Sequence, residues 1–139
     1  MAVAWDDVQR ILETTKTIAV VGLSDKPDRD SYQIASYLQQ QGYRIIPVNP
    51  RIKGVLGEKA YPSLRDVPDP VDVVDIFRRS EDVPPIVEDA IAIGAKVIWM
   101  QAGIVNEEAA ARAEAAGLAV IMDACMRSAH RTLRASGRI

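Results

Sequence analysis

Short runs of β-branched and other apolar residues recur along the chain, and a segment with helical spacing follows most of them. These runs predict strands near residues 17–22, 43–48, 71–76, 96–100 and 118–122. The runs are continuously apolar, which is typical of strands buried on both faces. Strand–helix alternation predicts an α/β fold, a Rossmann-like three-layer α/β/α arrangement around a five-stranded parallel sheet. The expected strand order is 3-2-1-4-5, with ligands bound outside the carboxyl ends of the strands.

Apolar spacing places helices in the segments 4–14, 31–41, 81–91, 107–116 and 125–133. A length of 139 residues fits one domain, so residues 1–139 are expected to fold together. Residues 134–139, beyond the last helix, are expected to form a loose tail.

Composition excludes several kinds of function. The net charge of −2 gives no strong electrostatic attraction to nucleic acid, so an anion site must be local. No apolar run approaches the roughly 20 residues of a membrane helix, and the first residues lack the pattern of a secretory signal. We therefore expect a cytoplasmic protein without nucleic-acid or membrane partners. Cys125 and His130 stand alone as Cys and His, so neither a disulfide nor a metal site is expected.

The loop after the first strand has the features of an anion site. Gly22 permits a tight turn, and the helix that follows offers unpaired N–H groups at its start. Ser31 can cap that helix or bind a phosphate oxygen, and Arg29 can add a bidentate contact. The glycine pattern G-x-G-x-x-G of dinucleotide sites is absent. The alternative is a plain strand–helix turn whose polar residues are solvated.

The loop after the second strand narrows the choice of ligand. Folds that bind NAD usually have an acidic residue here, which bonds the ribose hydroxyls. This chain instead has Asn49, Pro50 and Arg51, with Lys53 close behind. Cations in place of a carboxylate indicate a phosphorylated ribose, as in NADP or coenzyme A. The alternative is a basic loop that faces solvent.

The loops after the third and fourth strands add further candidates. Phe77 follows a strand directly and could pack against an adenine or a pantetheine arm, or equally belong to the core. Arg78 is expected to face phosphate. Gln101 and Gly103 follow the fourth strand, where glycine leaves space for a close approach of the backbone.

Five separated segments carry a resemblance to a known family. They are Gly22-x-Ser24-x-x-Pro27-x-Arg29-x-Ser31-Tyr32, Gly42-Tyr43-x-Ile45-Ile46-Pro47-Val48-Asn49-Pro50, Val71-Asp72-Val73-Val74-Asp75-Ile76-Phe77-Arg78, Trp99-Met100-Gln101-x-Gly103-Ile104 and Met122-Asp123-x-Cys125-Met126. Together they resemble the small, free-standing bacterial CoA-binding proteins of the YccU-like group. That group shares its fold with the nucleotide-binding domain of the succinyl-CoA synthetase α subunit.

The resemblance implies that coenzyme A, free or as an acyl-CoA, lies across the strand ends. Its phosphates would lie near Gly22, Ser24 and Arg29, and its 3′-phosphoribose near Asn49, Pro50 and Arg51. Its adenine and pantetheine would pass Phe77, Arg78, Gln101 and Gly103. The expected site also includes Leu23, Ser31, Tyr32 and Ile104. The family often has a Glu before the His of the last helix, where this chain has Ala129 before His130.

No convincing set of catalytic residues emerges. Cys125 and His130 are five residues apart on a predicted helix, and Ala129 leaves the pair without an orienting carboxylate. We expect a structural Cys125, with a mixed disulfide to the CoA thiol as the minority hypothesis. Asp72 and Asp75 are three apart on or beside a strand, hence on opposite faces, and Asp75 is expected to bond a backbone group or a loop near the site.

Binding therefore ranks above catalysis. The favoured hypothesis is a non-catalytic carrier, sensor or regulatory module for CoA or an acyl-CoA. The alternatives are an NADP-dependent oxidoreductase, weakened by the missing glycines, and a protein-interaction domain that has lost its ligand. A homodimer is the default oligomeric expectation.

Overall fold

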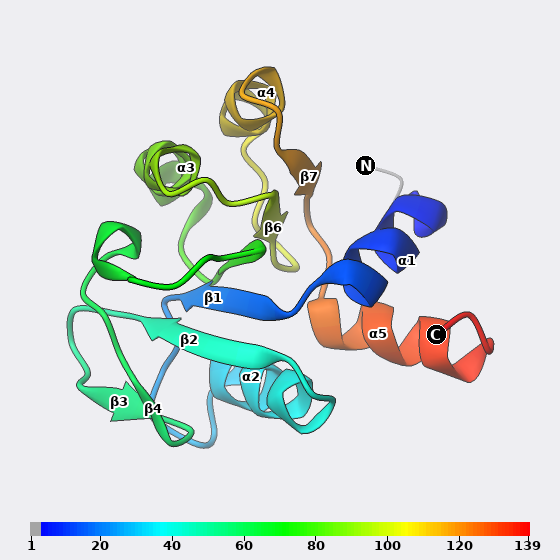
Figure 1. Cartoon of the computed structure of the whole chain (residues 1–139), viewed down its shortest axis with the longest axis horizontal. Helices are drawn as coiled ribbons and strands as arrows, with labels where there is room; N and C mark the ends of the chain where they lie inside the picture. The colour runs from blue at the N-terminus through cyan, green and yellow to red at the C-terminus, as the bar shows by residue number, and fades with distance from the viewer. Residues whose placement is uncertain (1–3) are drawn as a thin grey trace.

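The computed structural model describes residues 4–139, whose strands and helices follow the expected alternation. The main sheet is entirely parallel (Figure 1). Its strands are β1 (Thr17–Val21), β2 (Arg44–Val48), β5 (Val73–Ile76), β6 (Val97–Met100) and β7 (Ala119–Ile121). A five-stranded Rossmann-like α/β fold is thus confirmed.

The strand order differs from the expected one. The sheet runs β2-β1-β5-β6-β7, so the third strand of the sheet lies beside β1 and not outside β2. The outer edge of β2 is occupied by Tyr61, whose N–H donates to the Pro47 carbonyl at 3.0 Å. The Tyr61 carbonyl in turn accepts from Asn49 N–H at 2.9 Å. A small antiparallel hairpin of β3 (Gly54–Val55) and β4 (Glu58–Lys59) precedes this segment.

Helices cover both faces of the sheet (Figure 1). One face carries α1 (Trp5–Thr14), α2 (Asp30–Gln40) and α5 (Met126–Ala135). The other carries α3 (Val83–Ala92) and α4 (Glu107–Ala115), with the short 3-10 turns η1 (Leu64–Asp66) and η2 (Ser80–Asp82). The chain leaves β1 toward one face and β5 toward the other. The topological switch, where such folds bind ligands, therefore lies between β1 and β5.

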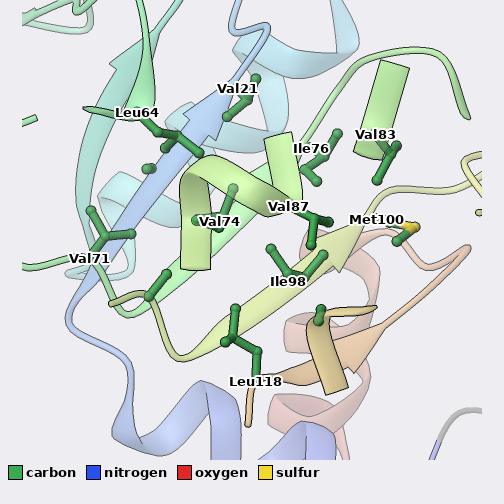
Figure 2. Packing of buried hydrophobic residues seen from close by; sticks show 14 of the residues in the cluster. Val21, Leu64, Val71, Val74, Ile76, Val83, Val87, Ile98, Met100 and Leu118 are labelled. Carbon is green, nitrogen blue, oxygen red and sulfur yellow. The ribbon is translucent and has the colours of Figure 1, made fainter. Parts of the chain in front are cut away.

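Alternation along the strands builds two cores. Figure 2 shows the core under α3, where Val74 and Ile76 of β5 and Ile98 and Met100 of β6 lie close to Val87. Their strand neighbours point to the opposite face, where the fully buried Trp99 lies in the second core. Burial on both faces explains why these strands read as continuous apolar runs.

The tail, expected to be loose, is held against the first helix. Helix α5 continues to Ala135. The Arg138 Nε–H donates to Gln9 Oε1 at 2.7 Å, and Gln9 Nε2 donates to the Arg138 carbonyl at 3.0 Å. Figure 1 shows the C-terminus beside α5, at the same side of the molecule as α1.

Candidate functional site

A large open pocket lies at the carboxyl ends of β1, β2 and β5, in front of the first turn of α2. Its volume is about 770 Å³. We call it the α2 pocket; its lining residues are Gly22, Ser24, Asp25, Lys26, Asp28, Arg29, Asp30, Ser31, Asn49, Arg51, Ile52, Phe77 and Arg78. The loops after three strands thus meet here, as the sequence predicted for an α/β sheet.

The start of α2 presents hydrogen-bond donors to this pocket. The N–H groups of Asp30, Ser31 and Tyr32 have no acceptor among residues 4–139. Ser31 Oγ accepts from Ser24 N–H at 3.0 Å, which leaves the Ser31 hydroxyl proton able to donate. Ser24 Oγ accepts from Lys26 N–H at 3.1 Å and so folds the loop. Donors at the positive end of a helix suit an anionic group.

A neighbouring loop leaves no space for a side chain at Gly22. Its φ is +88°, and a Cβ at this position would lie 2.5 Å from the Phe77 carbonyl oxygen. Its N–H donates to the Val48 carbonyl at 2.9 Å. The close approach expected here is therefore made by the loop after β5, which packs directly on the turn after β1.

Asn49 joins the loops after β1 and β2. Its side chain is buried, with Nδ2 donating to the Leu23 carbonyl at 3.0 Å. Its Oδ1 accepts from Arg51 N–H at 2.9 Å. Asn49 thus holds the backbone of Arg51 at the rim of the α2 pocket, a role that requires no ligand.

A second pocket opens on the α3 side of the same strand ends. Its volume is about 390 Å³, and it shares Arg51 and Arg78 with the α2 pocket. This α3 pocket is lined by Val21, Val48, Pro50, Arg51, Pro62, Ser63, Leu64, Arg78, Asp82, Ile86 and Asp89. Its apolar walls suit a flat apolar group next to the two arginines.

Three guanidinium groups line these pockets without a carboxylate partner. Among residues 4–139, no carboxylate oxygen lies within 4.0 Å of the Arg29, Arg51 or Arg78 guanidinium. Other arginines of the chain do form ion pairs: Arg44 with Asp69, Arg65 with Asp89 and Arg112 with Glu88. Asp25, Asp28 and Asp30 also line the α2 pocket, and all three are exposed to solvent. The unpaired guanidiniums remain available for an anionic ligand.

A third pocket, of about 230 Å³, lies between the starts of α2 and α5. It shares Phe77 and Asp30 with the α2 pocket. This α5 pocket is lined by Asp30, Ile34, Phe77, Gln101, Ala102, Ile104, Cys125 and Arg127. Phe77 also packs against the core under α2, which is one of the two roles that the sequence left open; its contact with a ligand stays a prediction.

A buried carboxyl group fixes one wall of the α5 pocket. Gln101 Nε2 donates to Asp75 Oδ1 at 2.5 Å, and Gln101 Oε1 accepts from Met126 N–H at 3.4 Å. Asp75 is fully buried, and its Oδ2 has no partner in the described chain. Burial raises the pKa of Asp75 to about 7, a rise that the Gln101 hydrogen bond opposes. The expectation that Asp75 bonds a loop near the site is confirmed.

Asp75→Asn should change how stability depends on pH. Because the folded pKa lies above the ordinary value of 3.8, the folded state holds its proton more tightly. Asp75 therefore lowers the free energy of unfolding as pH rises from about 4 to about 7, by up to about 1.4 kcal/mol per pH unit. Unfolding in urea measures the free energy of unfolding of both proteins at each pH. Between about pH 4 and about pH 7 the variant should become increasingly stable relative to wild type. Parallel curves would contradict the assignment.

Three predicted site residues line none of these pockets. Leu23 is fully buried, and Tyr32 packs against the same core. Gly103 adopts a φ of +84°, and its N–H donates to Asp123 Oδ1 at 2.6 Å. The other predicted residues do line a pocket: Gly22, Ser24, Arg29, Ser31, Asn49, Pro50, Arg51, Phe77, Arg78, Gln101 and Ile104.

The sequence did not point to two of the lining cations. Lys26 lies in the first loop, between the first strand and the start of α2, and this position was a usable signal. Arg127 is the second residue of α5, and no periodicity distinguishes it from the other arginines of that helix.

Cys125 and His130 are not brought together by a hydrogen bond within the described residues. His130 is buried, with Nδ1 at 2.8 Å from the Tyr37 hydroxyl. Burial, and secondarily Arg134, lowers the pKa of His130. Cys125 is partly buried, immediately precedes α5 and lines the α5 pocket.

Within residues 4–139, no three His, Cys, Asp or Glu side chains gather into a group able to hold a metal ion. None of the helices in the same range has the length and apolar character needed to cross a membrane.

Fold and pockets together define a Rossmann-like domain with unpaired cationic side chains at its strand ends, and sequence comparison assigns the domain to a family. A family described as "CoA binding domain" matches residues 16–131, and the chain belongs to this family. The chain is 48% identical over 124 residues to the uncharacterized protein YneT of Bacillus subtilis, covering 89% of this chain and 92% of that protein.

Larger relatives contain the same domain as a part. The chain is 35% identical over 83 residues to an ADP-forming acetate–CoA ligase of Archaeoglobus fulgidus. The match covers 58% of this chain and only 12% of that ligase.

Solved structures likewise include small proteins that match along nearly their whole length and larger enzymes that match over only a part. A hypothetical protein from Pyrococcus horikoshii superimposes with a TM-score of 0.92 at 42% identity, covering 96% of this chain and 94% of that one. A dinucleotide-forming acetyl-coenzyme A synthetase of Ca. Korarchaeum cryptofilum gives a TM-score of 0.72 at 30% identity, covering 84% of this chain and 28% of that chain. The family therefore includes small stand-alone proteins and parts of larger enzymes.

Proposed function

We propose that this protein binds coenzyme A or an acyl-CoA at the carboxyl ends of its sheet, as a non-catalytic carrier, sensor or regulatory module. Membership of the CoA-binding domain family supports the ligand class. The α2 pocket, with its unpaired arginines and open helix start, supports a ligand that carries several phosphates.

The observation that carries the proposal is the position of Arg51 and Arg78 between the two larger pockets. Both side chains line the α2 pocket and the α3 pocket, and neither has a carboxylate partner in the described chain. Coenzyme A combines a pyrophosphate, a phosphorylated ribose and an adenine. Adjacent polar and apolar pockets joined by two guanidiniums match that combination.

In this arrangement the pyrophosphate lies against the start of α2, near Gly22, Ser24 and Arg29. The 3′-phosphoribose lies near Asn49, Pro50 and Arg51. The remaining parts of the ligand pass Phe77 and Arg78 and reach Gln101, with Gly103 beyond it.

Titration calorimetry of the full chain with CoA, 3′-dephospho-CoA, NADP⁺ and NAD⁺ tests the proposal. CoA should bind most tightly, and removal of the 3′-phosphate should weaken binding because Arg51 then loses its partner. Tighter binding of NADP⁺ would favour the oxidoreductase alternative. An absence of heat and of any thermal shift with all four ligands would favour a protein-interaction domain.

A further inference from the structure

The α5 pocket is distinct from the two pockets assigned to the nucleotide, yet it adjoins one of them. Phe77 and Asp30 form a common wall between the α5 pocket and the α2 pocket. A ligand whose phosphates occupy the α2 pocket can therefore extend past Phe77 into the α5 pocket. For CoA, the part that extends away from the phosphates is the pantetheine arm with its thiol or acyl group.

Hydrogen bonds fix the shape of the α5 pocket. The Trp99 indole N–H donates to the Ala124 carbonyl at 2.8 Å, and Ala124 N–H donates to the Met100 carbonyl at 3.2 Å. Gln101 is held from both ends, by Asp75 and by Met126 N–H. The start of α5 is thereby tied to the end of β6, so the pocket is formed in advance of any ligand.

The walls of the α5 pocket are mainly apolar, with one cation, Arg127, and one carboxylate, Asp30. Ile34, Phe77 and Ile104 supply aliphatic and aromatic surface. At about 230 Å³ the pocket is smaller than a typical complete small-molecule site, so it suits a short group and not a long fatty chain.

Arg127 lacks the partners that a partly buried guanidinium needs. Its Nε–H is buried and has no acceptor in the described chain. No carboxylate lies within 4.0 Å of its guanidinium among residues 4–139, although Asp30 lines the same pocket. A buried donor without an acceptor destabilises the folded chain until a ligand or a water molecule accepts from it. Asp30 is exposed at the start of α2, where the helix dipole offsets its charge.

We propose that the α5 pocket binds the acyl end of a CoA thioester, and that Arg127 pairs with a carboxylate at the far end of a short acyl group. This inference rests on the proposed CoA binding and adds the class of acyl group. A carboxylate would give Arg127 the charge-assisted partner that the chain itself does not provide, while the apolar walls contact the methylenes.

Calorimetry with matched thioesters tests this assignment. Malonyl-CoA and glutaryl-CoA are compared with propionyl-CoA and pentanoyl-CoA, which have the same numbers of carbons and no terminal carboxylate. At least one carboxylated thioester should bind wild type about tenfold more tightly than its uncharged counterpart, as expected for one charge-assisted pair. Arg127→Gln should remove this preference and leave the affinity for free CoA within about twofold.

The control is Arg131→Gln. Arg131 lies one turn further along α5, over the Tyr37 ring, and lines none of the described pockets, so this variant should keep the preference. Wild type that binds CoA but shows no preference in either pair would overturn the assignment, as would a preference that survives Arg127→Gln. Wild type that binds none of these ligands would overturn the proposed function, and this inference with it.

Discussion

Arg51→Ala should weaken binding of CoA roughly 10- to 150-fold, about 1.5–3 kcal/mol, and should weaken binding of 3′-dephospho-CoA far less. Arg51 has no carboxylate partner within residues 4–139, so its side chain is free to pair with the 3′-phosphate. Titration calorimetry with both ligands on wild type and variant measures the difference.

Lys53→Ala is the matched control for Arg51. Lys53 lies in the same loop and carries the same charge, but it lines none of the three pockets. Its removal should change the affinity for both ligands by less than about threefold, because an exposed charge at a distance is screened. If Arg51→Ala weakened the binding of CoA and of 3′-dephospho-CoA by the same factor, the proposed contact between Arg51 and the 3′-phosphate would be contradicted.

Gly22→Ala should lower the free energy of unfolding by about 2–4 kcal/mol. An alanine here must adopt a φ near +88°, and its Cβ must displace the Phe77 carbonyl, which would lie only 2.5 Å away. Because that carbonyl is backbone, the loop after β5 has to move with it. Urea unfolding monitored by circular dichroism measures the loss.

Gly117→Ala separates the clash from the backbone strain. Gly117 has a φ of +92°, but a Cβ there would meet no atom within 4 Å. Its replacement should therefore cost only the left-handed conformation, about 1 kcal/mol. If Gly22→Ala cost no more than Gly117→Ala, the packing of the two loops would not be as described.

The fold class could be predicted from the sequence because burial on both faces leaves a strong apolar signal. The order of the strands was predicted wrongly, and one residue carried a signal against it. Pro47 has no N–H to donate, which suits an edge strand better than the interior position that the order 3-2-1-4-5 requires. In the structure β2 is the edge of the five-stranded sheet, and Pro47 uses only its carbonyl toward Tyr61.

The candidate site was predictable to the extent that parallel strands end at one edge. Residues of the loops after β1, β2 and β5, such as Ser31, Arg51 and Phe77, were placed together correctly by that rule. The rule does not say which way a loop side chain points, so Leu23 was included although it is fully buried. The rule also does not predict that the strand ends carry separate pockets, because the separation depends on how α2 and α5 pack around Phe77.

The buried pair of Asp75 and Gln101 illustrates a contact that spacing alone does not predict. Asp75 lies on β5 and Gln101 directly follows the neighbouring strand β6; a hydrogen bond of 2.5 Å joins them. The sequence suggested only that Asp75 would bond something near the site. Its partner depends on the register of β5 against β6.

Native mass spectrometry of freshly purified, full-length protein tests the central claim most directly. The chain has a mass of 15.2 kDa, so a bound CoA is readily resolved. The proposed function predicts a species heavier by the mass of CoA or of an acyl-CoA, present on purification or formed when CoA is added. A protein that stays at its sequence mass after CoA is added, or that takes up NADP instead, would contradict it.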